Sequence, residues 1–354
     1  MASETGLLMN AEQTPVAPQV LLYPLRFEPI YQHRLWGGRR LADLLTAPLP
    51  RGPVGEAWIL SDRDDHANQV SDGPLKGWTI GQLLEQFPEE MLGKLAGRFR
   101  RFPLLLKFLD VHEMLSVQVH PGRANKNLLP AGETPKTEAW VVLEAGPESR
   151  IYGGLKPGTT PASLRLAVEN GTVVDQLAEL TPKPGDAVFL PAGTVHALGG
   201  DVMVFEIQQN SDVTFRLYDW GHMDEKTGEL RPLQVEQAMA CIDFAEGAVG
   251  FVAPAVEMTT PVEREKLFDC EHFRLWRLRG QSSFAVGATG MPRVLVCIEG
   301  TGQVEHVGTS YPVGKGDVLL LPAVVGVCAF QPSSAVNLLE IGIPEIATIQ
   351  RVEE

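Results

Sequence analysis

Short apolar runs recur along the whole chain, and glycines and prolines separate them. Runs such as 104–109, 202–207 and 213–217 have the length of buried strands rather than of helices. The 35 glycines and 27 prolines among 354 residues supply the turns that such strands require. The pattern predicts a mainly β protein, and the length predicts two domains because one core rarely serves so many residues.

Two helical inserts are expected in the first part of the chain, at about 79–99 and 161–180. Thr79 is an N-cap candidate for the first insert, where apolar residues recur at helical spacing. The second insert begins with Thr160 followed by proline, a common helix start, and Gly171 separates its two short helices. Shorter helices are expected at 39–45 and 232–241.

One histidine follows two turns with a specific spacing. Gly185 begins the first turn, a short apolar strand follows, and Pro191 and Gly193 make the second turn before His196. The spacing G-x5-P-x-G-x2-H resembles the second metal motif of the cupin barrels. A lone histidine after a turn is more often a solvated or core residue than a ligand, so this assignment requires partners elsewhere in the chain.

Two upstream segments supply such partners. Ser116, Gln118 and His120 alternate with apolar residues, so a strand would place all three on one face. Lys136 and Glu138 alternate in the same way in a later segment. The amide, the imidazole and the carboxylate, with the histidine after the two turns, make an N/O site of four protein ligands. Such a site suits zinc and other first-row divalent ions.

Four segments, in this order, resemble the type I mannose-6-phosphate isomerases (phosphomannose isomerases), most closely their short bacterial form. They are LLLKFLDVHEMLSVQVHP, KTEAWVVLEAG, GDAVFLPAGTVHALGG and QNSDVTFRLYDWG. LWGG and GEAWILS near the start share the likeness, which covers about residues 25–245 with specific motifs. The resemblance implies two cupin-like jelly-roll barrels, a zinc-dependent isomerase, and mannose 6-phosphate and fructose 6-phosphate as its substrates.

The resemblance also implies the site residues. It implies that one zinc ion is bound by Gln118, His120, Glu138 and His196. It implies roles in catalysis or substrate binding for Arg216, Lys136, Lys107 and Ser116. To these we add Glu56, on the GEAW segment, and Asp212 as candidates for substrate contact.

Arg216 is a fixed cation with a planar fork of donors, so we expect it to clamp phosphate or the enediolate. The alternative is a surface ion pair with Asp212 or Asp219. In an isomerisation through an enediolate, a metal of fixed valence stabilises the oxygen on which negative charge develops, and redox chemistry is not required.

The residue that transfers the proton stays open. Long members of the family have a histidine just before the lysine of K-x-E, and this chain has Pro135 there. Proton transfer therefore falls to Lys136, Lys107 or a metal-bound water, and Lys136 could instead contact phosphate. Lys107 stands alone among apolar residues, so it has either a function or a structural carboxylate partner, such as Asp110 or Glu138.

The C-terminal half repeats the pattern of the first half. Residues 316–323 follow the pattern of 185–192, which places Val327 where His196 stands in the first copy. Valine cannot bind a metal, so this half is expected to have kept the fold without the site. We expect a loose tail over 1–18, a metal-binding domain over 19–248 and a C-terminal domain without a metal over 249–354.

The formal net charge of −14 disfavours nucleic-acid and membrane partners, and it requires a local cluster of cations for a phosphorylated substrate. No apolar run approaches the ~20 residues of a membrane helix, and the chain does not start like a signal peptide. The cysteines lack a C-x-x-C pair and are expected to be free thiols: Cys241, Cys270, Cys297 and Cys328. We expect a cytoplasmic monomer or homodimer.

Two other functions are considered. Two histidines and a carboxylate on a cupin barrel also suit a non-haem Fe(II) dioxygenase, but Gln118 and the family resemblance disfavour it. A regulator that binds sugar phosphates without catalysis would show tight binding and no turnover. The presence of both Lys136 and Arg216 favours an enzyme.

Overall fold

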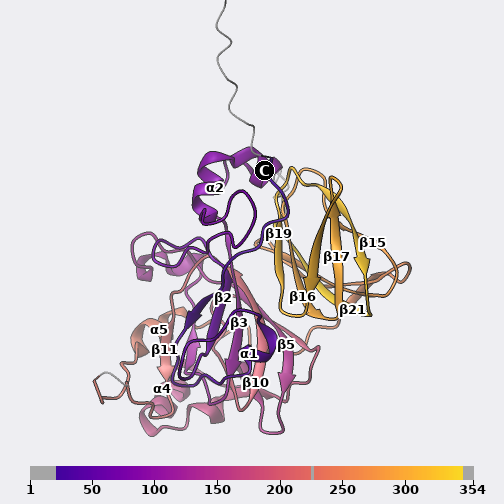
Figure 1. Ribbon diagram of the computed structural model, residues 1–354. Coiled ribbons are helices and arrows are strands. Elements are labelled where there is room, and N and C mark those ends of the chain that lie inside the picture. Colours follow the sequence, from indigo (N-terminus) through magenta and orange to yellow (C-terminus); the bar gives the residue numbers. More distant parts are fainter. Residues whose placement is uncertain (1–20, 225–226, 346–354) are drawn as a thin grey trace, which may run out of the picture.

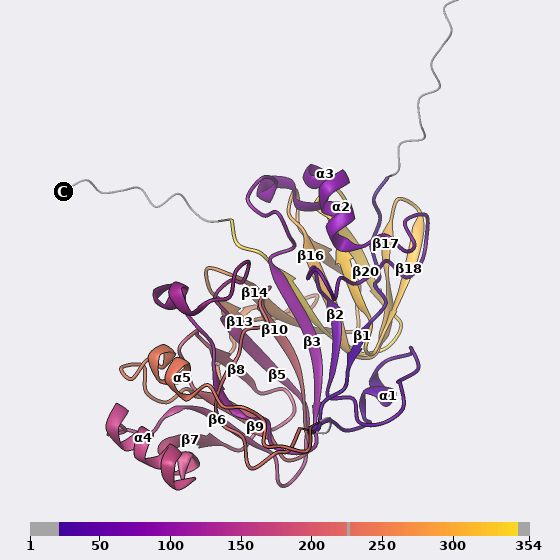
Figure 2. The ribbon, with the colours of Figure 1, turned by 90° about the vertical axis from the view of Figure 1, so that its left-hand side faces the viewer.

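The computed structural model describes residues 21–224 and 227–345 (Figure 1, Figure 2). The tail expected over 1–18 lies outside these residues. Strands dominate the fold, so the prediction of a mainly β protein is confirmed. Strands β1 to β11 build two antiparallel sheets, and β12 to β21 build two more.

The first half of the chain forms a six-stranded and a five-stranded sheet. In hydrogen-bonded order the larger contains β1 (Ile30–Gln32), β2 (Glu56–Leu60), β3 (Leu104–Val111), β10 (Val202–Gln209), β5 (Glu138–Ala145) and β8 (Ala187–Leu190). The smaller contains β11 (Phe215–Tyr218), β4 (Val117–Val119), β9 (His196–Gly199), β6 (Arg150–Leu155) and β7 (Leu177–Leu180). Trp140 and Val204 of the larger sheet and Ile151 and Leu198 of the smaller share one buried cluster, so the sheets pack face to face.

The first helical insert is shorter than predicted. It contains α2 (Ile80–Gln86), α3 (Pro88–Leu92) and the 3-10 turn Gly93–Leu95. Thr79 caps α2 as predicted, because its hydroxyl accepts a hydrogen bond from the Gln82 amide at 3.2 Å. The prediction that the helix continues to residue 99 is wrong, because Ala96 has a ψ of 139° and Gly97 a φ of +78°.

The second insert is helical only in its first part. Helix α4 (Pro161–Asn170) has the predicted cap at Thr160 and ends at Gly171, whose φ is 70°. The prediction of a helix over 173–180 is wrong beyond the 3-10 turn Val173–Gln176, because β7 pairs with β6. A short apolar run is compatible with either structure, and the free strand edge of β6 decides between them. The remaining helical segments are α1 (Leu41–Leu44), the 3-10 turn Arg123–Leu128 and α5 (Val235–Cys241).

The second half of the chain repeats the strand order of the first. Its six-stranded sheet contains β12 (Ala255–Met258), β13 (Glu263–Asp269), β14 (Arg274–Gly280), β21 (Val336–Gly342), β16 (Arg293–Glu299) and β19 (Val318–Leu321). Its four-stranded sheet contains β15 (Phe284–Gly287), β20 (Val327–Pro332), β17 (Thr301–His306) and β18 (Thr309–Gly314). Each of these strands has a counterpart at the same place in the first half. The domain boundary at residue 249 stays a prediction.

The two six-stranded sheets share one apolar core on their outer faces. Phe108 and Phe205 of the first sheet, Leu275 and Leu339 of the second, and Leu83 of α2 belong to the same buried cluster. The residues that alternate with this cluster on β2, β3, β5 and β10 point to the opposite, inner face. None of the helices in the described ranges has the length and apolarity that crossing a membrane requires.

Candidate metal centre and cavity

The four predicted metal ligands converge on the inner face of the first pair of sheets. Gln118 lies on β4, His120 directly follows that strand, Glu138 begins β5 and His196 begins β9. Gln118 and His196 are register partners across β4 and β9. Gly193, in the turn before His196, has a φ of +97°, a conformation that other residues rarely adopt. The turn therefore fixes the backbone position from which the His196 side chain extends.

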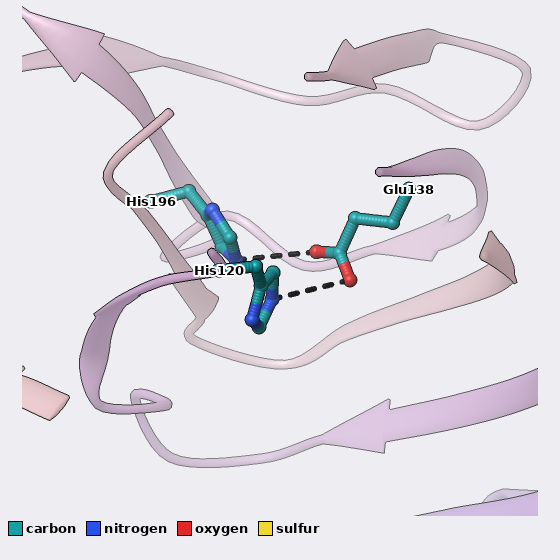
Figure 3. Close-up of side chains that lie close together, drawn as sticks. All are labelled: His120, Glu138 and His196. Carbon is teal, nitrogen blue, oxygen red and sulfur yellow. Dashed lines mark ion pairs between the residues drawn. The ribbon is translucent and has the colours of Figure 1, made fainter. Parts of the chain in front are cut away.

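Two imidazoles face one carboxylate, as Figure 3 shows. His196 Nε2 lies 3.1 Å from Glu138 Oε1, and His120 Nε2 lies 3.3 Å from Oε2. All three side chains are buried, and their nearest ligand atoms lie within 4.8 Å of one another. The structure thus brings together three of the four predicted ligands in one group that could hold an ion.

The far nitrogen of each ring fixes its tautomer. His120 Nδ1 lies 2.8 Å from the carbonyl oxygen of Val213, and His196 Nδ1 lies 2.9 Å from that of Thr194. A carbonyl only accepts hydrogen bonds, so each Nδ1 carries the hydrogen and each Nε2 presents a lone pair. Both lone pairs then face Glu138, whose oxygens are also acceptors.

A cation between these facing acceptors would stabilise them. Within the described residues, His120 Nε2 and both oxygens of Glu138 are buried without a hydrogen-bond partner. Burial, and then the charge of Lys136, lower the pKa of His120 to about 3, so a proton does not fill the gap at neutral pH. A divalent ion bound by two imidazoles and a carboxylate would satisfy all of these atoms, and zinc prefers such donors.

Gln118 is turned the wrong way for a metal ligand. Its Nε2 lies 3.3 Å from His196 Nε2, while its Oε1 accepts a hydrogen bond from the Ser116 hydroxyl at 3.4 Å. An amide binds a metal through its oxygen, so ligation requires the side chain to turn over. The assignment of Gln118 as the fourth ligand stays a prediction.

A cavity of about 940 Å³ adjoins the metal centre. Its wall contains all of the predicted catalytic and substrate-binding residues: Arg216, Lys136, Lys107, Ser116, Glu56 and Asp212. Lys136 Nζ lies 2.7 Å from Glu138 Oε2, close enough for an ion pair although not in the geometry of a hydrogen bond. Gln118 also lines the cavity, so a ligand in the cavity would reach the metal centre.

Lys107 is buried among three carboxylates. Its Nζ lies 3.3 Å from Glu206, 3.5 Å from Asp212 and 3.9 Å from Glu56. Burial alone would lower the pKa of Lys107, but these carboxylates raise it above its ordinary value. The prediction that Asp110 or Glu138 would be the carboxylate partner of Lys107 is wrong. Within the described residues, Asp110 pairs with Arg40 and Glu138 pairs with Lys136.

Glu56 forms ion pairs with Arg34 and with Lys107. It accepts a hydrogen bond from Arg34 Nε at 2.8 Å and from Trp58 Nε1 at 2.7 Å. Burial raises the pKa of Glu56, but Lys107 and then Arg34 outweigh burial and lower it to about 2. Glu56 is therefore a charged carboxylate at the cavity wall.

Arg216 is half-buried and has no ion pair with any residue in the described ranges. Its Cα stands opposite that of Gln118 in the pairing of β11 with β4. The two carboxylates considered as alternative partners are engaged elsewhere, Asp219 with Arg231 and Asp212 with Lys107. Burial and then the charge of Arg231 lower the pKa of Arg216.

Sequence reasoning missed several polar residues in the cavity wall, among them Arg34, Glu206 and Arg231. Glu206 is a lone charge in an apolar strand, which is the same signal that singled out Lys107. Burial and the charge of Glu138 raise the pKa of Glu206, and Trp140 Nε1 donates a hydrogen bond to it at 2.8 Å. Arg34 stands next to the LWGG motif, whereas no local pattern marks Arg231.

The chain is similar to proteins of one known family. Residues 24–139 match the family described as phosphomannose isomerase type I, catalytic domain. The chain is 35% identical over 315 residues to mannose-6-phosphate isomerase ManA of Bacillus subtilis, which covers 86% of this chain and 94% of that protein. It is 30% identical to the mannose-6-phosphate isomerase of Streptococcus mutans over 84% of this chain and 92% of that protein. The crystal structure of the Bacillus subtilis mannose 6-phosphate isomerase superimposes with a TM-score of 0.83 at 28% identity, over 90% of this chain and 99% of that one.

Proposed function

Because the chain belongs to the type I mannose-6-phosphate isomerases, we propose that it interconverts mannose 6-phosphate and fructose 6-phosphate through an enediolate, with zinc as its metal. One observation carries the proposal. The buried carboxylate of Glu138 and the Nε2 lone pair of His120 have no hydrogen-bond partner in the described ranges and lie in one group with His196, beside a cavity that the guanidinium of Arg216 lines.

His120, Glu138 and His196 would hold the ion, and Gln118 would join them once its amide turns over. Two neutral imidazoles and one carboxylate would leave a divalent ion a residual charge of about +1. When bound, the ion would supply Lewis-acid polarisation of the sugar oxygen on which charge develops.

The residues of the cavity divide the remaining work. We assign proton transfer between C2 and C1 to Lys136, which lines the cavity beside Glu138 and follows Pro135. Lys107 is held in its charged form by three carboxylates, so it suits electrostatic stabilisation better than the removal of a proton. Arg216, opposite Gln118, would stabilise the charge of the enediolate.

Ser116, Glu56 and Asp212 line the same cavity and are our candidates for contacts with the sugar hydroxyls. A charged carboxylate such as Glu56 accepts hydrogen bonds from hydroxyls, and a serine can donate or accept. We also propose a cytoplasmic location, which the four free cysteines support. The choice between monomer and homodimer stays open.

A coupled assay of mannose 6-phosphate to fructose 6-phosphate tests the function, run with native protein, after chelation and after zinc is restored. We expect turnover that chelation removes and zinc restores. Turnover by a protein in which metal analysis finds no ion would disprove the metal dependence. Bound iron with oxygen uptake would favour the dioxygenase, and tight binding of the sugar phosphate without turnover would favour the regulator.

A further inference from the structure

Arg231 is a second guanidinium in the wall of the cavity, close to Arg216. Gln234, which lies just after Arg231 in the chain, is hydrogen-bonded to β11. Its side-chain oxygen accepts a hydrogen bond from the backbone N–H of Arg216 at 3.1 Å, and its backbone N–H donates to the carbonyl oxygen of Arg216 at 2.8 Å. The two arginines therefore stand on neighbouring stretches of backbone at the same wall.

Asp219 holds one edge of the Arg231 guanidinium. Arg231 Nε donates to Oδ2 at 2.6 Å and Nη2 donates to Oδ1 at 2.5 Å, and the carboxylate is buried. Nη1 has no hydrogen bond to any other residue in the described ranges. A bidentate carboxylate fixes the rotamer of an arginine, so its remaining donors are aimed before a ligand arrives.

Two guanidiniums stand close together at this corner. Burial and then the charge of Arg231 lower the pKa of Arg216, so the two cations lie within electrostatic reach of each other. Asp219 forms an ion pair with Arg231, and the wall also contains the carboxylate of Asp224. In a protein of net charge −14, a dianion gains most where two guanidiniums stand together.

We infer that Arg231 binds the phosphate group of the sugar phosphate, and that Asp219 is the residue that positions it. The inference rests on the proposed function, because it takes a phosphate monoester as the substrate. It also orients that substrate: the phosphate lies at Arg231, while the reacting carbons lie toward Gln118 and Lys136 at the metal centre. Arg216 is then free to act on the charge that develops during the reaction.

Kinetics of zinc-loaded Arg231→Gln test this role, with inorganic phosphate as a competitive inhibitor. We expect the KM for mannose 6-phosphate and the inhibition constant of phosphate to rise together, by about 10-fold or more, while kcat changes by less than about 3-fold. Arg231→Lys keeps the charge but loses the parallel donors of the guanidinium, so its KM and inhibition constant should lie between those of wild type and Arg231→Gln. Arg165→Gln, which removes an exposed arginine of α4 outside the cavity, should leave all three constants unchanged.

A purely structural role predicts a different result. If Arg231 only neutralises Asp219, the midpoint of thermal unfolding should fall while the inhibition constant of phosphate stays at the wild-type value, and this outcome would overturn the inference. The double variant Arg231→Gln, Asp219→Asn removes the unpaired buried carboxylate and keeps the test valid if the single variant unfolds. Calorimetric titration with phosphate measures the same site without turnover, so a protein that binds phosphate through Arg231 but does not isomerise the sugar would disprove only the proposed function.

Discussion

The two halves of the chain have the same strand order, but they use their inner faces differently. In the first half Gln118 pairs with His196, and at the same place in the second half Gly287 pairs with Val327. The counterpart of Glu138, opposite the last residue of the neighbouring strand, is Arg293. Three of the four proposed metal ligands thus correspond to a glycine, a valine and a cation in the second half, none of which binds a metal.

At the place of the lysine that lines the cavity, the second half has an aromatic side chain. Lys107 stands opposite Glu206 in the first half, while Trp276 stands opposite Glu340 in the second. Trp276 belongs to the apolar cluster between the second pair of sheets. Glu340 is satisfied by Arg264 at 2.7 Å and by the amide of Gly287 at 2.7 Å.

The difference separates what folds the chain from what the site requires. The second half forms the same kind of sheets with Trp276 in place of Lys107 and Arg293 in place of Glu138, although it buries charges of its own such as Glu340. The sheets therefore do not require the lysine or the carboxylate of the first half. In the first half Lys107 and its carboxylates lose their hydration when they are buried, and their attraction only partly offsets this cost. The cluster of Lys107 and its carboxylates is not needed for the fold, so a role in the reaction explains it best.

Truncation of the side chain at the matching position of each half gives the largest expected contrast. His196→Ala should lower the metal content from one ion per chain toward zero and reduce turnover by at least ~10²-fold, because the ion loses one of its imidazoles. The matched change Val327→Ala should alter neither quantity, since Val327 is 56% exposed and lies outside the cavity. Metal analysis, the coupled assay and circular dichroism check both variants. Full activity of metal-depleted His196→Ala would disprove the metal centre.

Substitution of Arg216 should give the next largest effect. Arg216 lies on β11, a strand that has no counterpart in the second half. Arg216→Lys keeps the charge and loses the two parallel donors. If Arg216 stabilises charge that appears only in the transition state, kcat should fall by ~10²-fold with a modest change in KM. A higher KM with an unchanged kcat would show instead that it anchors phosphate in the ground state. Arg165→Lys serves as the matched exposed control.

Acid should destabilise the first half through the buried carboxylate of Glu56. The pKa of Glu56 is about 2 in the folded chain and ordinarily 4.5, so its contribution to stability is present above pH 4.5 and is lost as the pH falls toward 2. Glu56→Gln should therefore flatten the pH dependence of the unfolding free energy in that range, by at most about 1.4 kcal/mol per pH unit. Denaturant titrations of metal-free protein measure this slope, and the exposed Glu246→Gln is the control. Equal slopes in Glu56→Gln and wild type would contradict the assignment.

Local patterns in the sequence predicted the strands, the helix caps at Thr79 and Thr160, and the meeting of His120, Glu138 and His196 in one buried group. They succeeded because alternation, capping and turn spacing depend on residues close together in the chain. The helices expected over 173–180 and up to residue 99 were wrong, because a neighbouring strand edge and the backbone at Gly97 decided those segments. Arg231 could not be predicted, since its place at the cavity depends on Asp219, twelve residues away.

The smallest expected effect comes from an attempt to restore the lost ligand. Val327→His puts an imidazole at the start of β20, where His196 begins β9. It should add no second metal, because its strand partner is Gly287 and the position of the carboxylate is taken by Arg293, whose charge repels a divalent ion. Turnover should also stay the same, since the cavity has no wall from this half within the described residues. Metal analysis of wild type and variant, with both activities measured in the same assay, checks the prediction. About two ions per chain in either protein would show that the second half has kept a site after all.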